Sequence, residues 1–255
     1  MTIGTYLTDL AGQLVLNGAE KASIDTSINS ISTRVKAYFG DDVSEHFRFG
    51  SSTRGTILPR GFDYDSDIDY MVVFRDSAFS HQTYLNKLRR FAEFYYSTSN
   101  ISQSFPTQKL SLSHIYFDLV PARRGDFGLQ IPDSGGQWIN TYPHLFNADL
   151  TRKNTQKFSL LKPAIRLIKR WNAKNFHPYQ SFVLEQKAAA LPFTFCYNLP
   201  MMFKHIVDNM SEYDLGAEYQ RAKIRTLKKR VKTAFDDEAE GYKHLPEAEI
   251  KKIFE

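Results

Sequence analysis

Two aspartates one residue apart open an apolar segment of the sequence. Asp67 and Asp69 begin DIDYMVVF, and the apolar continuation predicts a strand over 67–74. Side chains at i and i+2 of a strand point to the same face, with Cα atoms roughly 6.5 Å apart. Two carboxylates placed in this way can share a pair of divalent cations about 3.5–4 Å apart, and Mg²⁺ prefers such hard oxygen ligands. The pattern therefore predicts a site for two magnesium ions.

A third carboxylate is expected from a neighbouring strand. Asp118 is the acidic residue of this half that is embedded in a strongly apolar strand, HIYFDLVPA. A buried carboxylate is costly unless it is paired or bound to metal. Pairing with an arginine such as Arg123 is the alternative, but the neighbouring DID strand favours metal ligation. Asp63 and Asp65 share the parity of the DID pair, yet they precede the strand in a loop and are not expected to be ligands.

A Gly-Ser turn precedes these carboxylates. Gly50 ends the short strand FRFG, and glycine permits close approach of a ligand to the backbone. Ser51 would supply a backbone N–H and a hydroxyl at the start of the next helix, where phosphate oxygens bind well. Gly-Ser alone is a common turn, but ahead of the DID strand it predicts a triphosphate cradle facing the metal ligands. Arg54 is either another phosphate contact or a solvated loop charge.

Two helical segments in the second half carry further candidates. They are LKPAIRLIKRWN, over 161–172, and YQSFVLE, over 179–185. An inward-pointing Lys169 and a Ser181 at a helix start could grip the β- and γ-phosphates, and Phe182 could stack on a base. The alternatives are a solvated lysine and a helix cap, and both stay open.

Composition sets the class of protein. The 255 residues are 42% hydrophobic and 24% charged, as in folded globular proteins. A single cysteine, Cys196, excludes an internal disulfide and a multi-cysteine metal site, and it favours a reducing, cytoplasmic compartment. The start lacks a basic region before an apolar run, and prolines break the most apolar stretch, 188–203, so neither a signal peptide nor a membrane span is expected. A formal charge of +5 favours anionic partners.

The remaining periodicities organise the chain as an α/β protein in two parts. We expect a catalytic core with N-terminal helices over residues 1–145 and an α-helical part over 146–255. Asp25 or Ser23 could cap the second N-terminal helix. The expected elements of the core are helices within 1–46, a strand from Phe47, a strand over 67–74, a helix over 81–96, a strand over 111–122 and a hairpin over 127–142.

Together these segments resemble the cGAS/DncV-like nucleotidyltransferases, also called second-messenger oligonucleotide or dinucleotide synthetases. These are bacterial relatives of the animal DNA sensor cGAS and of oligoadenylate synthetase. The resemblance covers roughly residues 45–190. The Gly-Ser turn and the D-x-D strand are specific only to the polymerase-β-like superfamily, and K-R-W-N and S-F-x-L-E narrow the match to this family. The resemblance rests on these motifs together with R-G-T, F-D-L-V-P and the I-P-D…G-G-Q-W hairpin.

The resemblance implies a polymerase-β-like core with a helical lobe that closes over the nucleotide site, and a definite chemistry. Nucleoside triphosphates would be joined into a cyclic di- or oligonucleotide with release of pyrophosphate, in bacterial anti-phage signalling through a downstream effector. Two Mg²⁺ ions, for which Mn²⁺ can substitute, would be held by Asp67, Asp69 and Asp118. By position in the family motifs, Ser51, Lys169 and Ser181 resemble the donor-triphosphate contacts, and Phe182 resembles the residue that stacks on the base. The chain has no Cys/His zinc insertion, so no nucleic-acid activator is expected.

Two other functions stay open. One is an RNA-directed terminal nucleotidyltransferase of tRNA-end or poly(A) type, which needs a track for a long acceptor. The candidate track, residues 221–232, has seven basic residues in twelve, but its apolar positions recur at helical spacing. That spacing favours a packed helix with a solvated basic face. The other is an inactive nucleotide-binding module, against which the intact set of three carboxylates argues.

Overall fold

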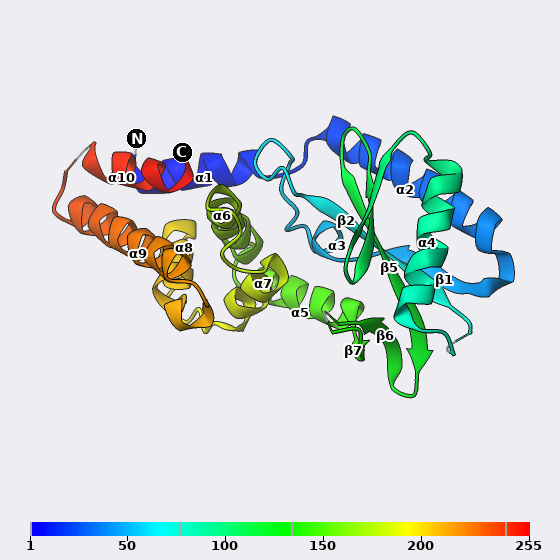
Figure 1. The fold of residues 1–255 in the computed structure, drawn as a ribbon. Helices are drawn as coiled ribbons and strands as arrows, with labels where there is room; N and C mark the ends of the chain where they lie inside the picture. The colour runs from blue at the N-terminus through cyan, green and yellow to red at the C-terminus, as the bar shows by residue number, and fades with distance from the viewer. Residues whose placement is uncertain (1, 77, 134, 243) are drawn as a thin grey trace. The chain divides into compact units, whose positions relative to one another are not determined.

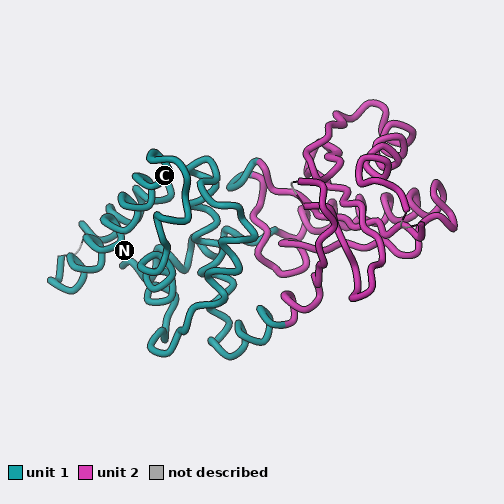
Figure 2. Tube along the Cα trace, turned by 60° about the horizontal axis from the view of Figure 1, so that its bottom comes forward, with its two compact units in different colours: residues 1–16, 61–64, 149–255 teal, residues 17–60, 65–148 magenta. Residues whose placement is uncertain are grey.

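A computed structural model describes residues 2–76, 78–133, 135–242 and 244–255. The chain divides into two compact units (Figure 2). Unit 1 consists of residues 1–16, 61–64 and 149–255, and unit 2 of residues 17–60 and 65–148.

The two N-terminal helices lie in different units, the second in unit 2 and the first in unit 1. The first helix, α1 (Ile3–Gln13), belongs to unit 1, where it packs against helices α6 and α8 and buries Ile3, Leu7 and Leu10. Apolar periodicity shows that a helix has a face to bury, but it does not show which partner buries it.

Unit 2 is built on a mixed sheet (Figure 1). Within the described residues its central order is β1-β2-β5-β4-β3, and β6 and β7 extend from the end of β5. Strands β2 and β5 are parallel, whereas the other pairs are antiparallel. The strands are β1 (Val43–Arg48), β2 (Asp67–Phe74), β3 (Asn100–Ser104), β4 (Thr107–Ser111), β5 (Tyr116–Gly125), β6 (Gly128–Pro132) and β7 (Trp138–Thr141).

Helices α2 and α4 pack against the sheet. Phe74 of β2 lies between them, with ring centroids 5.4 Å from Phe39 of α2 and 4.9 Å from Tyr84 of α4. The alternating residues Ile68 and Phe117, which share this face, are fully buried. The helices of unit 2 are α2 (Gly18–Phe39), α3 (Ser51–Arg54) and α4 (His81–Tyr95).

Helix α2 begins earlier than its apolar pattern suggests. The cap is neither Asp25 nor Ser23 but Asn17, which forms a reciprocal capping box with Glu20. The first turns of the helix are largely exposed, so no apolar position marks them. Asp25 instead forms an ion pair of 3.1 Å with Arg48 of β1.

Several elements of unit 2 match the expected ones, and two differ. The strand over 67–74 has those bounds, and the helix over 81–96 ends one residue earlier. The hairpin over 127–142 consists of β6 and β7, with Ser134 of its turn outside the described residues. The stretch expected to be helical up to residue 46 instead enters β1 at Val43. The expected strand over 111–122 is two strands, because β4 ends at Ser111 and β5 begins at Tyr116.

Unit 1 is helical. Helix α9 buries Ile224, Leu227, Val231 and Ala234, which agrees with a packed helix over the basic segment. No helix among the described residues has the length and apolar character needed to cross a membrane. Besides α1, the helices are α5 (Pro143–Gln156), which begins in unit 2, α6 (Leu161–Lys174), α7 (Ser181–Ala190), α8 (Leu199–Asn209), α9 (Glu218–Ala239) and α10 (Leu245–Phe254).

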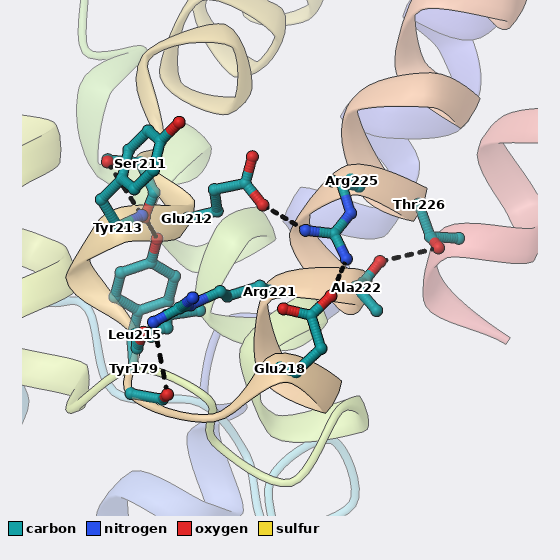
Figure 3. Close-up of polar contacts among 11 residues, drawn as sticks. Tyr179, Ser211, Glu212, Tyr213, Leu215, Glu218, Arg221, Ala222, Arg225 and Thr226 are labelled. Carbon is teal, nitrogen blue, oxygen red and sulfur yellow. Dashed lines mark hydrogen bonds and ion pairs between the residues drawn. The ribbon is translucent and has the colours of Figure 1, made fainter.

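The turn before α9 is held by arginines of α9 itself (Figure 3). Arg225 pairs with both Glu212 and Glu218. Arg221 donates from Nε to the carbonyl oxygen of Leu215 at 2.9 Å. Two of the basic side chains in the segment over 221–232 therefore stabilise the local fold.

Candidate functional site

The parallel pairing of β2 with β5 brings three carboxylates to one face of the sheet. Asp69 lies opposite Asp118 in the register, and Asp67 lies two residues before Asp69 on the same strand. Paired residues of neighbouring strands share a face, as do residues at i and i+2. The residues between them, Ile68 and Phe117, point to the opposite face and are fully buried. The expected carboxylate set is thus assembled within unit 2.

The surroundings of Asp118 shift its pKa. Burial raises its pKa, while Lys109, its register partner on β4, and the Thr107 hydroxyl act in the opposite direction. Its Oδ1 is buried and has no hydrogen-bond partner among the described residues. A buried carboxylate oxygen in this state is costly, and a bound divalent cation would satisfy it. The donor set therefore fits a hard divalent metal ion.

The alternative partner for Asp118 faces the other way. Arg123 is an odd number of residues from Asp118 along β5, which places the two side chains on opposite faces. Arg123 donates to Gln130 at 3.1 Å, and its guanidinium lies 4.3 Å from the centre of the Trp138 ring. This geometry does not favour a structural Arg123–Asp118 ion pair.

Gly50 lies directly against the carboxylate of Asp69. A Cβ atom added at Gly50 would lie 1.7 Å from Oδ2 of Asp69, and the residue has a φ of +73°. Only glycine combines this backbone conformation with so close an approach. The N–H of Phe49 donates to the carbonyl oxygen of Asp69 at 3.0 Å, which fixes the turn to the strand. Ser51, the first residue of α3, follows directly and is half-buried.

Arg54 and Asp63, which follow the Gly-Ser turn in the sequence, are both buried. The Arg54 guanidinium lies 5.5 Å from the centre of the Phe146 ring. Because the residue is buried, its interpretation as a solvated loop charge is wrong. Asp63 is buried in unit 1, where its Oδ1 lies 3.3 Å from Nε2 of His177. Asp63 therefore has a partner within its own unit.

In unit 1, Lys169 is buried in an ion pair. Its Nζ lies 2.9 Å from Oε1 of Glu185 on α7, and the two side chains are 6% and 0% exposed. The interpretation of Lys169 as a solvated charge on the helix surface is therefore wrong. Its ammonium ties α6 to α7 through a carboxylate that the sequence reasoning did not consider. A direct contact of Lys169 with phosphate stays a prediction.

The start of α7 is fixed without the help of Ser181. The N-cap is Gln180, whose side chain makes no capping hydrogen bond, and Ser181 is the first helical residue, so the helix-cap alternative for Ser181 is wrong. Asn172 of α6 instead holds the approach to the helix, because its side chain binds both the N–H (3.0 Å) and the carbonyl oxygen (2.9 Å) of Tyr179. Phe182, which follows Ser181, is 45% exposed.

The predicted site residues thus fall into two sets. Gly50, Ser51 and the three carboxylates lie in unit 2, and Lys169, Ser181 and Phe182 lie in unit 1. A nucleotide site that combines both sets stays a prediction. Sequence reasoning missed Asn172 and Glu185, although both belong to the quoted motifs K-R-W-N and S-F-x-L-E. A polar residue on the buried face of a helix is the signal that could have revealed them.

A family model and several solved structures are similar to this chain. Residues 1–154 match the family model SMODS, the Second Messenger Oligonucleotide or Dinucleotide Synthetase domain. Similar solved structures include Vibrio cholerae DncV cyclic AMP-GMP synthase, with 12% identity, a TM-score of 0.78, and coverage of 99% of this chain and 96% of that one. CdnC of E. coli MS115-1 with ATP has 14% identity, a TM-score of 0.72 and coverage of 98% and 97%. No curated protein matches.

The mixed α/β architecture is that of the DncV-like nucleotidyltransferases, as expected from the sequence. A third match, the CD-NTase CdnG of Bradyrhizobium diazoefficiens with GTP, has 14% identity, a TM-score of 0.70 and coverage of 97% and 96%. Because the family model spans more than half of the sequence, the chain belongs to the second messenger oligonucleotide or dinucleotide synthetase family. The expected family and fold class are confirmed.

Proposed function

We propose that this protein is a metal-dependent nucleotidyltransferase that condenses nucleoside triphosphates into a cyclic di- or oligonucleotide and releases pyrophosphate. The observation that carries the proposal is the shared face of Asp67, Asp69 and Asp118, with the buried Oδ1 of Asp118 lacking a partner among the described residues. When bound there, two Mg²⁺ or Mn²⁺ ions would activate the attacking hydroxyl and neutralise charge on the phosphates.

The other residues would bind and orient the donor nucleotide. Gly50 would let the triphosphate approach the metal ligands, and Ser51 would bind it through its N–H and hydroxyl. Ser181 would contact the γ-phosphate and Phe182 would stack on the base. The Lys169–Glu185 ion pair would position the start of α7 for these contacts, and Lys169 would add positive charge.

Structures of relatives support nucleoside triphosphates as substrates. CdnC is recorded with ATP, CdnG with GTP, and DncV with the linear intermediate 5′ pppA(3′,5′)pG. We place the protein in bacterial anti-phage signalling, with its cyclic product acting on a separate effector.

The test is incubation with all four labelled nucleoside triphosphates and Mg²⁺ or Mn²⁺, followed by phosphatase treatment and mass spectrometry. We expect a cyclic product that resists phosphatase. Absence of any condensed product under both metals would overturn the proposal, and extension of an added RNA in place of cyclic product would assign the protein to the terminal nucleotidyltransferases.

Synthesis by the purified protein is expected to proceed without added nucleic acid. The chain lacks a Cys/His zinc insertion, and its formal charge is only +5. Product formation should therefore be the same with and without duplex DNA or RNA. A large stimulation that falls steeply with salt, as counterion release requires, would contradict this expectation.

Gly50→Ala is expected to reduce kcat about 100-fold, because the new Cβ displaces the Asp69 carboxylate from its position. The positive φ should also lower the free energy of unfolding by about 1–3 kcal/mol. Gly61→Ala is the matched control, because no atom lies within 4 Å of its added Cβ. Steady-state kinetics and melting curves of both variants check this, and full activity of Gly50→Ala would show that the close approach has no catalytic role.

A further inference from the structure

A groove runs along α9 in unit 1 and is formed by two adjoining pockets of about 200 and about 330 Å³. Both pockets are lined by Thr226 and Arg230, and we call them together the α9 groove. Its floor is apolar, with Trp171, Leu227 and Ile253 all buried. Its polar lining includes Lys223, Lys229, Arg230, Glu249 and Lys252.

The lining of the α9 groove is cationic. Four of its side chains are lysine or arginine, and Glu249 is the acidic one among the lining residues. Glu249 contacts Arg230 at 3.4 Å and Lys252 at 2.5 Å. These partly exposed pairs are weak, so a bound phosphate can replace them. Lys229 is exposed and forms no ion pair with any residue that the structure describes.

The other basic side chains of α9 have structural partners elsewhere. Arg221 and Arg225 hold the turn before the helix (Figure 3). Lys228 donates to the carbonyl oxygen of Asp208 at 2.9 Å, and Lys232 pairs with Asp236 on the same helix. Lys229 has no comparable structural partner in the described parts of the chain, so its charge is available to a ligand.

Two exposed aromatic rings lie around a cation of the same groove. Phe176 is 86% exposed and Tyr219 is 64% exposed. The Nζ of Lys223 lies 4.9 Å from the centre of the first ring and 5.7 Å from the centre of the second. Phe176 follows the end of α6, where helix-terminating hydrogen bonds account for its φ of +63°.

Cations along a groove and exposed rings beside it are the two features that bind single-stranded nucleic acid. Base stacking distinguishes this ligand from an acidic peptide, which needs the charge alone. From Lys223 to Thr233 the helix rises by roughly 15 Å, which gives room for several phosphates in a row.

We propose that the α9 groove binds a single-stranded oligonucleotide, with its phosphates against Lys229, Arg230 and Lys252 and a base on Phe176 or Tyr219. The inference concerns binding and not activation, and it does not depend on the proposed catalytic function. Cellular RNA and single-stranded DNA share the phosphodiester chemistry, and the experiment compares them.

The experiment measures fluorescence anisotropy of labelled oligo(U) and oligo(dT) of about eight nucleotides. It uses the full chain with EDTA and without nucleoside triphosphate, so turnover is impossible. Each phosphate contact contributes about 0.7 to the salt slope for a single strand, so three contacts predict roughly 20-fold weaker binding at 200 mM than at 50 mM salt. Binding of oligo(U), of oligo(dT) or of both with this slope supports the proposal, and the tighter of the two identifies the source.

Matched variants locate the site. Lys229→Glu is expected to weaken binding at least about tenfold, whereas Lys232→Glu makes the same charge change outside the groove and should alter affinity less than about twofold. Phe176→Leu should weaken binding roughly 5- to 100-fold through lost stacking, and Phe176→Tyr should retain it. All of these side chains are exposed or half-exposed, and melting curves verify folding.

Three results would overturn the proposal. They are absence of binding at 50 mM salt, equal losses for Lys229→Glu and Lys232→Glu, and complete competition by an equal concentration of free ATP. The second would indicate non-specific attraction, and the third a mononucleotide site. None of the three affects the synthesis assay, so failure here is separate from failure of the proposed function.

Discussion

Asp69→Asn is expected to lower the rate of product formation by at least about 1,000-fold while leaving the protein folded. Asparagine keeps the side-chain volume, but it removes the negative charge that binds a divalent cation. Asp67→Asn should have the same effect, because both carboxylates lie on the face shared with Asp118. The measurement is product formation from labelled triphosphates at saturating Mg²⁺, with circular dichroism and melting curves to verify the fold. A folded double variant that still condensed triphosphates would show that these aspartates do not bind the catalytic metal.

Asp118→Asn should also be inactive. Unlike most substitutions of buried residues, however, it should not lower the free energy of unfolding at neutral pH. Burial raises the pKa of Asp118, so the folded protein favours the neutral carboxyl, and stability falls as pH rises through that raised pKa. Without metal, the Asn variant should therefore be at least as stable as wild type at neutral pH. The difference should vanish below the unfolded pKa of about 3.9.

Mg²⁺ should raise the melting temperature of wild type more than that of the Asp118→Asn variant. Full activity of this variant would show that Asp118 has only a structural role.

The second large effect concerns the buried ion pair of unit 1. Lys169→Ala is expected to reduce the free energy of unfolding by about 3–5 kcal/mol, because it breaks a buried ion pair in which Glu185 is fully buried. Glu185→Gln should destabilise the protein similarly by leaving the ammonium unpaired. The double variant Lys169→Met, Glu185→Leu should regain much of the loss, because an apolar pair needs no desolvation of charge. Urea unfolding of the three proteins checks this, and an unchanged stability of Lys169→Ala would contradict it.

The same double variant separates the structural role of Lys169 from phosphate binding. If Lys169 contacts the donor, KM for the triphosphate should rise in the stable double variant by an amount corresponding to about 1.5–3 kcal/mol. An unchanged KM would leave the residue a purely structural role. Ser181→Ala should raise KM with little loss of stability, because Ser181 is not the N-cap of α7.

The strand positions of the three carboxylates could be predicted because their signals are local. The parity of Asp67 and Asp69 follows from the strand that they begin, and Asp118 is a single charge within an apolar run. Their meeting, however, depends on the β2–β5 register, which no local pattern specifies. Lys109 was missed for the same reason, since it reaches Asp118 only through the β4–β5 register.

Other elements carried signals too weak to detect. Strand β3 is polar and largely exposed, so it has no apolar alternation, and β4 buries the polar residue Gln108 on its inner face. In unit 1, the pairing of Lys169 with Glu185 depends on how two helices pack, whereas periodicity describes one helix at a time. Such contacts between elements are the part of the site that the sequence alone does not specify.

The parallel pairing of β2 with β5 also has a consequence for folding kinetics. Because parallel strands cannot be joined by a tight turn, α4 and the β3–β4 hairpin lie between them in the chain. The carboxylates therefore meet only after this long segment has closed, a non-local step that comes late in folding. A divalent cation that binds all three would then stabilise the native state far more than the transition state. We expect it to slow unfolding and leave the refolding rate nearly unchanged.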